Sequence, residues 1–576
     1  MKDEIKQCQN CKKDFVIEQE DFNFYEKIKV PAPTWCPECR FQRRLAFMNV
    51  YSLYKRKCDK CNENIISMFH KDRKQIVFCS KCWWADDWDG TEYSIDYDSS
   101  RNFLEQFLEL KNKTPHMSVD TLYSSLINTN YTNYASHLKN CYALFYADFC
   151  ENSFYSDFLN TLKDSSDCHR ARESELCYEC TGIYKCFNCV SCLECENSFD
   201  LFFCKNCSGC NDCFGSINLK NKQYCVFNKQ YSKDEYLDFI KNIDLFSYSE
   251  FSKYKKMSED FWITQPNREY YGNSLNVNVS GNYVYESKNA HDIYLGTSIE
   301  NSRFVQFISV PSTKDSYDYT CWGGNSSLIY ETLIAGHEAS DIKFCIGSYP
   351  DSYNNEYSYY SSSCKYIFGC SNLKRKKYCI LNKEYSKDEY EKLRIQIMSS
   401  MDKNPYIDKK GRIYKYGEFF PIEFSPFGYN ETIANQYFVK NKKEVLESGY
   451  LWFESTPNEY VNTIKFSELP DKLNDFKNVL NEVIKCKCGR CYKIIEGELN
   501  ILKKLNLRIP RKCPECRRKN RFDLVLSPRL YDRECAKCKR EIKIAYSPDR
   551  PEIVYCEKCY QQEVYLSSNS NRTIIY

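Results

Sequence analysis

Paired cysteines at the two ends of the chain place the strongest restriction on what this sequence can fold into. C-x-x-C pairs occur at Cys8/Cys11, Cys36/Cys39, Cys58/Cys61 and Cys79/Cys82, and again at Cys488/Cys491, Cys513/Cys516, Cys535/Cys538 and Cys556/Cys559. The last three pairs of each set are related by a constant offset of 477 residues, and their flanks agree, as in CPECRFQRR against CPECRRKNR. One module has therefore been duplicated, and a copy stands at each end of the chain.

The spacing of these cysteines predicts metal ligands. Each C-x-x-C places two thiolates on one tight turn, and two such turns make a tetrahedral four-sulfur site that zinc normally occupies, with no open position for catalysis. Pairing consecutive turns predicts four structural zinc ions, bound by all sixteen cysteines of these pairs. Cys486 is an extra cysteine that competes with Cys488 as a ligand. Surface cysteines without a metal would not keep their spacing and flanks in two copies.

The first unit of each set resembles the probable zinc-ribbon domain of treble-clef type found in many bacterial proteins. CQNCKKDFVIEQEDFNFYEKIKVPAPTWCPECR fits that domain well, and CGRCYKIIEGELNILKKLNLRIPRKCPECR fits it without the aromatic pair. The resemblance implies zinc, with Cys8, Cys11, Cys36 and Cys39 as ligands in one copy and Cys488, Cys491, Cys513 and Cys516 in the other. It implies no activity.

The whole chain also resembles a family of uncharacterised bacterial proteins in which tandem ribbons flank a cysteine-rich middle. The segment YGEFFPIEFSPFGYNET (416–432) is similar to one of the recurring segments of that family. This resemblance implies the architecture and no particular function.

The cysteines of the middle are periodic. Those at 168, 177, 186, 195, 204 and 213 are nine residues apart, and a second series at 189, 207 and 225 is spaced by 18. A fixed short period is typical of a solenoid, and we expect about 18 residues per coil, with cysteines as small core residues stacked in ladders. Additional zinc and iron–sulfur clusters are the alternatives, although ferredoxin motifs have a longer last gap that is followed by proline.

Each expected solenoid ends in the same sequence. FGSINLKNKQYCVFNKQYSKDEY (214–236) and FGCSNLKRKKYCILNKEYSKDEY (368–390) match at an offset of 154 residues. Ser232 with Glu235, and Ser386 with Glu389, predict capping boxes that start a helix over each last coil. The second solenoid is expected at about 272–379, where apolar clusters recur every 24–25 residues.

These patterns predict a mainly β protein. Its middle is a cysteine-rich, parallel β-helix-like solenoid with capping helices, and tandem zinc ribbons flank it at both ends. The expected segments are ribbons at 1–90, a helical connector at 91–130, a solenoid with its capping helix at 131–245, a second solenoid-like region at 246–400, an irregular connector and helix at 401–485, and ribbons at 486–576.

The distribution of charge predicts a binding function. The chain carries a formal charge of only +3, but Lys503–Lys543 holds 15 Lys/Arg against 5 Asp/Glu, and Arg40–Cys61 holds 7 against 1. Basic groups on a rigid ribbon suit phosphate backbones, and exposed Trp83, Trp84 and Tyr560 would stack on unpaired bases. Nucleic acid is therefore the first expected partner, RNA ahead of DNA. The expected contact residues are Arg40, Arg43, Arg44, Lys55, Arg56, Arg511, Lys512, Arg517, Arg518, Lys519 and Arg521.

Two other functions stay open. The solenoid suits a scaffold that binds a protein partner or a glycan, and in that case the acidic middle and the basic ends attract each other. An iron–sulfur redox protein is the third. No sequence motif of a catalytic site or a phosphate-binding loop occurs, so nothing argues for an enzyme. The start MKDEIKQCQN lacks an apolar signal core, and no 18-residue apolar run occurs. We therefore expect a cytoplasmic protein without a membrane partner.

Overall fold

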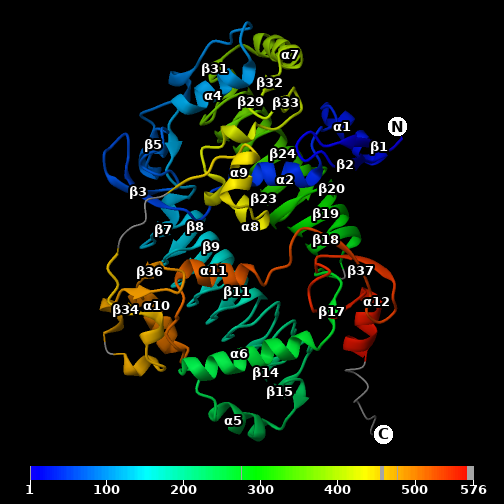
Figure 1. Cartoon of the computed structure of the whole chain (residues 1–576). Coiled ribbons are helices and arrows are strands. Elements are labelled where there is room, and N and C mark those ends of the chain that lie inside the picture. The colour runs from blue at the N-terminus through cyan, green and yellow to red at the C-terminus, as the bar shows by residue number, and fades with distance from the viewer. Residues whose placement is uncertain (1, 274, 455–459, 477, 567–576) are drawn as a thin grey trace. The chain divides into compact units, whose positions relative to one another are not determined.

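The structure is a computed structural model that describes residues 2–273, 275–454, 460–476 and 478–566. The chain divides into two compact units. Unit 1 combines residues 1–119 with 270–454, and unit 2 combines residues 120–269 with 455–576 (Figure 1). Each unit contains one β-solenoid and one pair of cysteine ribbons, so each joins segments that lie far apart in the sequence. The predicted fold class, a mainly β chain with a cysteine-rich solenoid and capping helices, is confirmed.

The solenoid of unit 2 completes one turn every twelve residues. Asp157 pairs with His169, and His169 pairs with Thr181, in parallel register. The longer coil predicted from the cysteine spacing is therefore wrong. Its strands are β7 (Leu126–Ile127), β8 (Asn133–Lys139), β9 (Phe145–Glu151), β10 (Asp157–Lys163), β11 (His169–Glu175), β12 (Thr181–Tyr184), β13 (Phe199–Phe202), β14 (Asn211–Phe214) and β15 (Gln223–Val226).

Within each turn the residues follow a period of three. A left-handed residue, such as Tyr134 (φ 52°), His137 (φ 50°) or Asn140 (φ 53°), recurs at every third position and makes a corner. The residue that follows each corner points inward, as Ala135, Leu138 and Cys141 do. The two cysteine spacings, nine and eighteen, are both multiples of three. They are regular for that reason, although neither spacing is the length of a turn.

Cysteine fills most of the interior of this solenoid, as the ladder prediction expected. Fourteen buried cysteines belong to the core cluster, together with Ala, Leu and Ile side chains. Most of these thiols lie near two backbone carbonyls: Cys180 Sγ lies 3.4 Å from the Tyr178 oxygen and 3.2 Å from the Cys189 oxygen. Burial raises the pKa of Cys141 to about 11. These thiols are small core groups that donate to backbone carbonyl oxygens, such as that of Cys189, which also accepts from the Tyr178 amide.

The solenoid of unit 1 has wider and less regular turns. Paired residues lie twelve positions apart at Tyr294↔Gln306, fourteen at Gln306↔Thr320 and thirteen at Thr320↔Leu333. Larger side chains such as Ile308, Tyr319 and Ile342 fill this wider interior. Its strands are β18 (Val277–Tyr285), β19 (Lys288–Thr297), β20 (Ile299–Arg303), β21 (Gln306–Val310), β22 (Thr313–Lys314), β23 (Tyr317–Gly323), β24 (Ser326–Gly336), β25 (Ser340–Lys343), β26 (Ile346–Ser348), β27 (Tyr353–Glu356), β28 (Tyr359–Ser361), β29 (Lys365–Phe368) and β30 (Lys377–Ile380).

A hairpin and a helix close the last turn of each solenoid. β15 turns back into β16 (Lys229–Gln230), and β30 into β31 (Lys383–Glu384). Helices α5 (Lys233–Lys241) and α7 (Lys387–Lys403) follow, and both predicted capping boxes are present. Helix α6 (Tyr248–Ile263) packs on the first solenoid through Phe251, whose ring lies 5.0 Å from that of Phe203.

The connecting segments contain less regular structure. Helix α4 (Phe103–Lys113) matches the helix expected in the 91–130 connector. The segment 401–485 holds the short helices α8 (Ala434–Tyr437) and α9 (Lys442–Glu447). The helix predicted near its end is wrong, because the described residues there form short 3-10 turns at Leu473–Asp475 and Val479–Asn481 and the strand β35 (Ile484–Lys485). Within the described ranges, no helix combines the length and the apolar character needed to cross a membrane.

Candidate metal centres and the ribbon–solenoid contacts

Four groups of cysteines could each hold a metal ion. Within each group the sulfur atoms all lie within 4.8 Å of one another. The groups are Cys8/Cys11/Cys36/Cys39, Cys58/Cys61/Cys79/Cys82, Cys486/Cys488/Cys513/Cys516 and Cys535/Cys538/Cys556/Cys559. Four sulfurs at this separation fit a tetrahedral ion such as zinc. Among the described residues these are the groups with metal-ligand geometry, and the solenoid cysteines contribute to none of them.

Each ribbon brings its ligands together on a hairpin and a helix. In the first ribbon, β1 (Glu4–Gln7) pairs with β2 (Asp14–Ile17), and after α1 (Gln19–Ile28) the helix α2 (Pro37–Leu45) starts at Cys36. The second ribbon consists of β3 (Tyr54–Lys57), β4 (Asn64–Ser67), β5 (Val77–Phe78) and α3 (Ser80–Trp84). The third consists of β35 (Ile484–Lys485), β36 (Cys491–Tyr492), α10 (Glu496–Lys504) and α11 (Pro514–Phe522). The fourth consists of β37 (Tyr531–Glu534), β38 (Glu541–Ile544), β39 (Val554–Tyr555) and α12 (Glu557–Tyr560).

The first cysteine of each group accepts a hydrogen bond from the amide of the third. The Cys36 amide donates to Cys8 Sγ at 3.2 Å, and the Cys79 amide donates to Cys58 Sγ at 3.2 Å. Burial opposes ionisation of Cys58, but the amides of Cys61 and Cys79 lower its pKa to about 7. Such donors favour the thiolate, which is the form that binds a metal.

The third group contains Cys486, whereas the C-x-x-C spacing predicted Cys491 as the fourth ligand beside Cys488, Cys513 and Cys516. The Cys513 amide donates to Cys486 Sγ at 3.3 Å, as the equivalent amides do in the other ribbons. The turn is one residue shorter, and Gly489 (φ 91°) supplies its left-handed position. The Cys491 thiol instead points to the Tyr460 carbonyl at 3.6 Å. The sequence held the signal, because the offset of 477 residues maps Cys11 onto Cys488 and leaves Cys491 unmatched.

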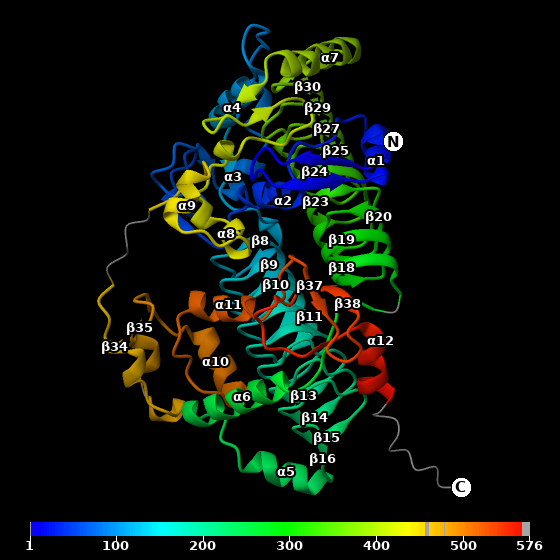
Figure 2. The same ribbon diagram turned by 45° about the vertical axis from the view of Figure 1, so that its right-hand side comes forward.

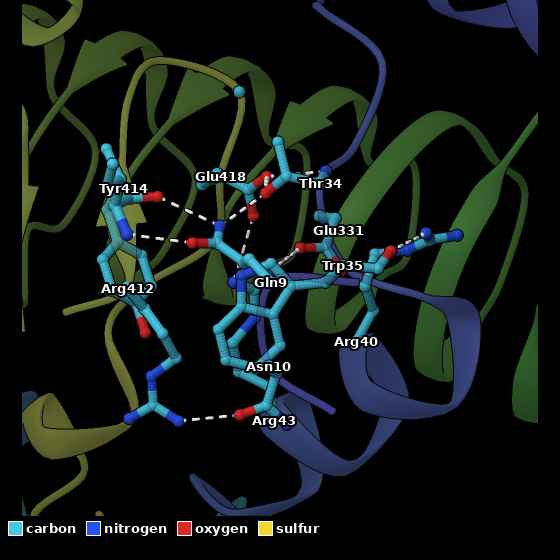
Figure 3. Close-up of polar contacts among 12 residues, drawn as sticks. Gln9, Asn10, Thr34, Trp35, Arg40, Arg43, Glu331, Arg412, Tyr414 and Glu418 are labelled. Atoms are coloured by element: carbon cyan, nitrogen blue, oxygen red, sulfur yellow. Dashed lines mark hydrogen bonds and ion pairs between the residues drawn. The ribbon is translucent and has the colours of Figure 1, made fainter. Parts of the chain in front are cut away.

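The arginines of the N-terminal basic island hold the first ribbon on the solenoid of unit 1. Helix α2 packs on β23 and β24. Arg40 and Arg44 reach the two carboxylate oxygens of Asp318, at 2.8 and 3.2 Å. Arg43 pairs with Glu331 and with Glu418, the latter at 3.2 Å (Figure 3). All three guanidinium groups are buried, with at most 1% of each side chain exposed.

The C-terminal copy makes the same contact in unit 2, where α11 lies across the strands of the first solenoid (Figure 2). Arg517 Nη1 lies 2.5 Å from Asp167 Oδ2, and Arg521 pairs with the other oxygen of Asp167. The offset of 477 residues maps Arg40 and Arg44 onto Arg517 and Arg521. Asp318 (φ 51°) and Asp167 (φ 57°) both occupy left-handed corners of their solenoids. We call each set of two arginines and one aspartate an arginine clamp.

The segment 416–432 also binds ribbons within unit 1. Glu418 accepts hydrogen bonds from the Thr34 amide at 2.9 Å and from Arg43, as Figure 3 shows. Glu431 accepts one from the Tyr54 hydroxyl of the second ribbon at 2.8 Å and pairs with Arg73.

Five of the eleven expected nucleic-acid contacts are unavailable. Arg40, Arg43, Arg44, Arg517 and Arg521 are buried in ion pairs, so none of them can reach a phosphate in this structure. Trp83 and Tyr560, expected to stack on bases, are buried as well, and Trp84 is half-buried. Arg56, Arg511 and Arg518 are half-buried, and only Lys55, Lys512 and Lys519 of the expected set are exposed. The correction has one physical reason: the acidic partners of these arginines lie in distant parts of the sequence.

Comparisons with known proteins add little to this description. No family model and no curated protein matches the chain. Among solved structures, a "putative acetyltransferase" from Desulfovibrio desulfuricans G20 matches at 9% identity over 50% of this chain and 86% of that chain. Its TM-score of 0.11 supports no inference about this protein. Fold and site together define the class: a β-solenoid protein with four cysteine groups able to bind metal.

Proposed function

We propose that this protein is a non-catalytic scaffold in which four structural zinc ions hold ribbons that clamp two β-solenoids. The observation that carries the proposal is the arginine clamp, which occurs in both units with equivalent residues. A four-sulfur site has no open position for a reaction. The ribbons use their basic side chains on their own solenoids, and the solenoids retain long surfaces for a partner.

The metal content of the purified protein tests this proposal. We expect about four zinc ions per chain and no iron absorbance in the visible spectrum, because sulfur tetrads of this kind favour zinc. Removing the metal with a strong chelator should weaken the packing of the ribbon helices α2 and α11 on their solenoids. Hydrogen exchange around Asp167 and Asp318 should then become faster. Stoichiometric iron, or exchange rates unchanged after complete removal of metal, would contradict the proposal.

Binding of nucleic acid remains a second prediction, carried by the exposed lysines alone. Each phosphate contact contributes to the salt dependence of binding. A single-stranded RNA probe should therefore bind the metal-loaded protein weakly. The double substitution Lys512→Ala and Lys519→Ala should remove most of that binding. Tight binding that falls steeply between low and physiological salt would instead return nucleic acid to first place.

A further inference from the structure

A groove of about 500 Å³ runs along the first solenoid within unit 2. One wall is a ladder of amide side chains at one corner of successive turns: Asn128, Asn140, Asn152 and then Asp164. The half-buried Tyr142 and the buried Phe154 also belong to the lining. Residues of helix α10 complete it, and Phe154 packs against Ile501 of that helix.

The amide ladder satisfies half of its own hydrogen-bonding capacity. Asn128 donates to Asn140 at 3.0 Å, Asn140 to Asn152 at 3.1 Å, and Asn152 to Asp164 at 2.9 Å. A carboxamide has two N–H donors and an oxygen with two lone pairs. Each internal amide of the ladder therefore retains one donor and one acceptor. Adjacent rungs are about 4.8 Å apart, so these spare groups form a regular row.

The backbone permits this row of amides but does not require it. Asparagine is favoured at left-handed positions, but every corner of the solenoid is left-handed. The preceding corner of each turn carries His137, Phe149, Thr161 and Glu173 at equivalent positions. The side chains of a corner are therefore free to vary. Amide ladders also occur away from the groove, from Asn206 to Asn218 and from Asn278 through Asn289 to Asn301. The ladder in the groove differs from these in lying beside helix α10 and Tyr142.

Helix α10 adds polar groups and narrows the groove. Exposed Glu496, Asn500 and Lys504 line the wall. Lys504 is held by Asp164 at 2.9 Å. A Cβ atom at Gly497 would lie 2.2 Å from the ring of Phe154, so glycine allows the helix to pack directly on this buried ring, which leaves the ring of Tyr142 as the more accessible one.

These features favour one class of ligand. The row offers side chains and no free strand edge, because the strand hydrogen bonds are used between turns, and this disfavours addition of a peptide strand. Asp164 and Glu496 outnumber Lys504, which disfavours a polyanion. Sugar hydroxyls both donate and accept, and the apolar face of a sugar ring can lie against an aromatic ring. We propose that the groove binds a neutral linear oligosaccharide. The proposal rests on the proposed scaffold function, because α10 belongs to a metal-binding ribbon.

The test titrates the full-length, metal-loaded protein with cellohexaose, chitohexaose and maltohexaose, followed by calorimetry and saturation-transfer NMR. We expect at least one of the three to bind with a Kd of about 1 mM or tighter. Tyr142→Ala and, on the exposed helix wall, Asn500→Ala should each weaken binding by about tenfold.

The matched control is Phe149→Ala, which removes an exposed aromatic ring stacked on His137 at a different corner of the same solenoid. It should leave the Kd unchanged. Absence of binding by all three sugars, or equal loss of affinity in Phe149→Ala, would overturn the proposal. Metal content is measured on the same samples. If the protein holds four ions but binds none of the sugars, the oligosaccharide proposal is refuted and the scaffold proposal still stands.

Discussion

Asp167 and Asp318 are each paired with two buried arginines. Substituting Asp167 by Asn should leave the guanidinium groups of Arg517 and Arg521 buried without their full charge partner. Breaking a buried ion pair in this way costs about 3–5 kcal/mol. We therefore expect Asp167→Asn to lower the free energy of unfolding of unit 2 by about that amount, measured by urea denaturation.

Glu173→Gln is the matched control for this substitution. Glu173 is exposed and pairs with Lys185 at 3.7 Å on the same solenoid. Exposed pairs contribute roughly 0–1 kcal/mol, so this variant should unfold almost as the wild type does. If Asp167→Asn is equally mild, the arginine clamp does not stabilise the unit.

A second prediction separates two neighbouring cysteines. Cys486→Ser removes a sulfur from the third group and should reduce the metal content by about one ion per chain. Cys491→Ser should keep all ions, because its sulfur lies outside the group. Elemental analysis of the two variants side by side decides between them, and the reverse result would restore the assignment based on C-x-x-C spacing.

The metal-binding cysteines and the acidic partners of the arginines differ in how well the sequence predicts them. Metal ligands repeat locally, so a spacing rule and a duplicated copy identify them, and only the shortened turn at Cys486 was missed. The arginine partners could not be found in this way, because Arg517 and Asp167 are 350 residues apart. A cluster of basic residues looks the same in sequence whether it faces solvent or a buried carboxylate.

The number of residues in a solenoid turn is likewise hard to predict from the sequence. The cysteine spacings of nine and eighteen revealed a repeat, but the length of a turn is fixed by strand register, which no one-dimensional spacing contains. The true turn follows from pairs such as Asp157↔His169. In unit 1 the turns vary between twelve and fourteen positions, so the recurrence of 24–25 residues predicted for the apolar clusters only approximates two turns.

The period of three leads to a prediction about insertions. One alanine inserted after Asn188 should move the following residues out of phase and turn interior cysteines toward solvent. Duplicating residues 181–192 adds a complete turn and keeps every cysteine inside. We expect the thiols of the first variant to react faster with a thiol reagent under native conditions than those of the second. Equal protection in both variants would refute the assigned phase.

At the scale of a whole unit, ion pairs make stability depend on pH. Burial opposes the charge of Glu179, but Arg508 and Lys255 outweigh it and hold its pKa well below the usual value. The unfolded chain therefore takes up a proton near pH 4.3 that the folded unit does not. The stabilisation is fully present above about pH 5 and is lost as the pH falls further.

The variant Glu179→Gln isolates this contribution. At pH 7 it should be less stable than the wild type by about 3 kcal/mol, because Arg508 loses its buried partner. The difference should narrow between pH 5 and pH 3, as the wild type loses its own ion pair. Denaturation curves of both proteins across this range provide the measurement. A difference that stays constant would mean that Glu179 does not titrate differently in the two states.

The pairing of distant segments also sets an order of events during synthesis. Asp167 leaves the ribosome about 350 residues before the arginines that neutralise it. At roughly 5–20 residues per second, this carboxylate waits on the order of 20–70 s for its partners. The first solenoid must therefore stay intact while its ribbon-binding side is bare. A core of small thiols with local turn-to-turn contacts allows the solenoid to stay folded during this interval, because each new turn completes its hydrogen bonds with the turn just made.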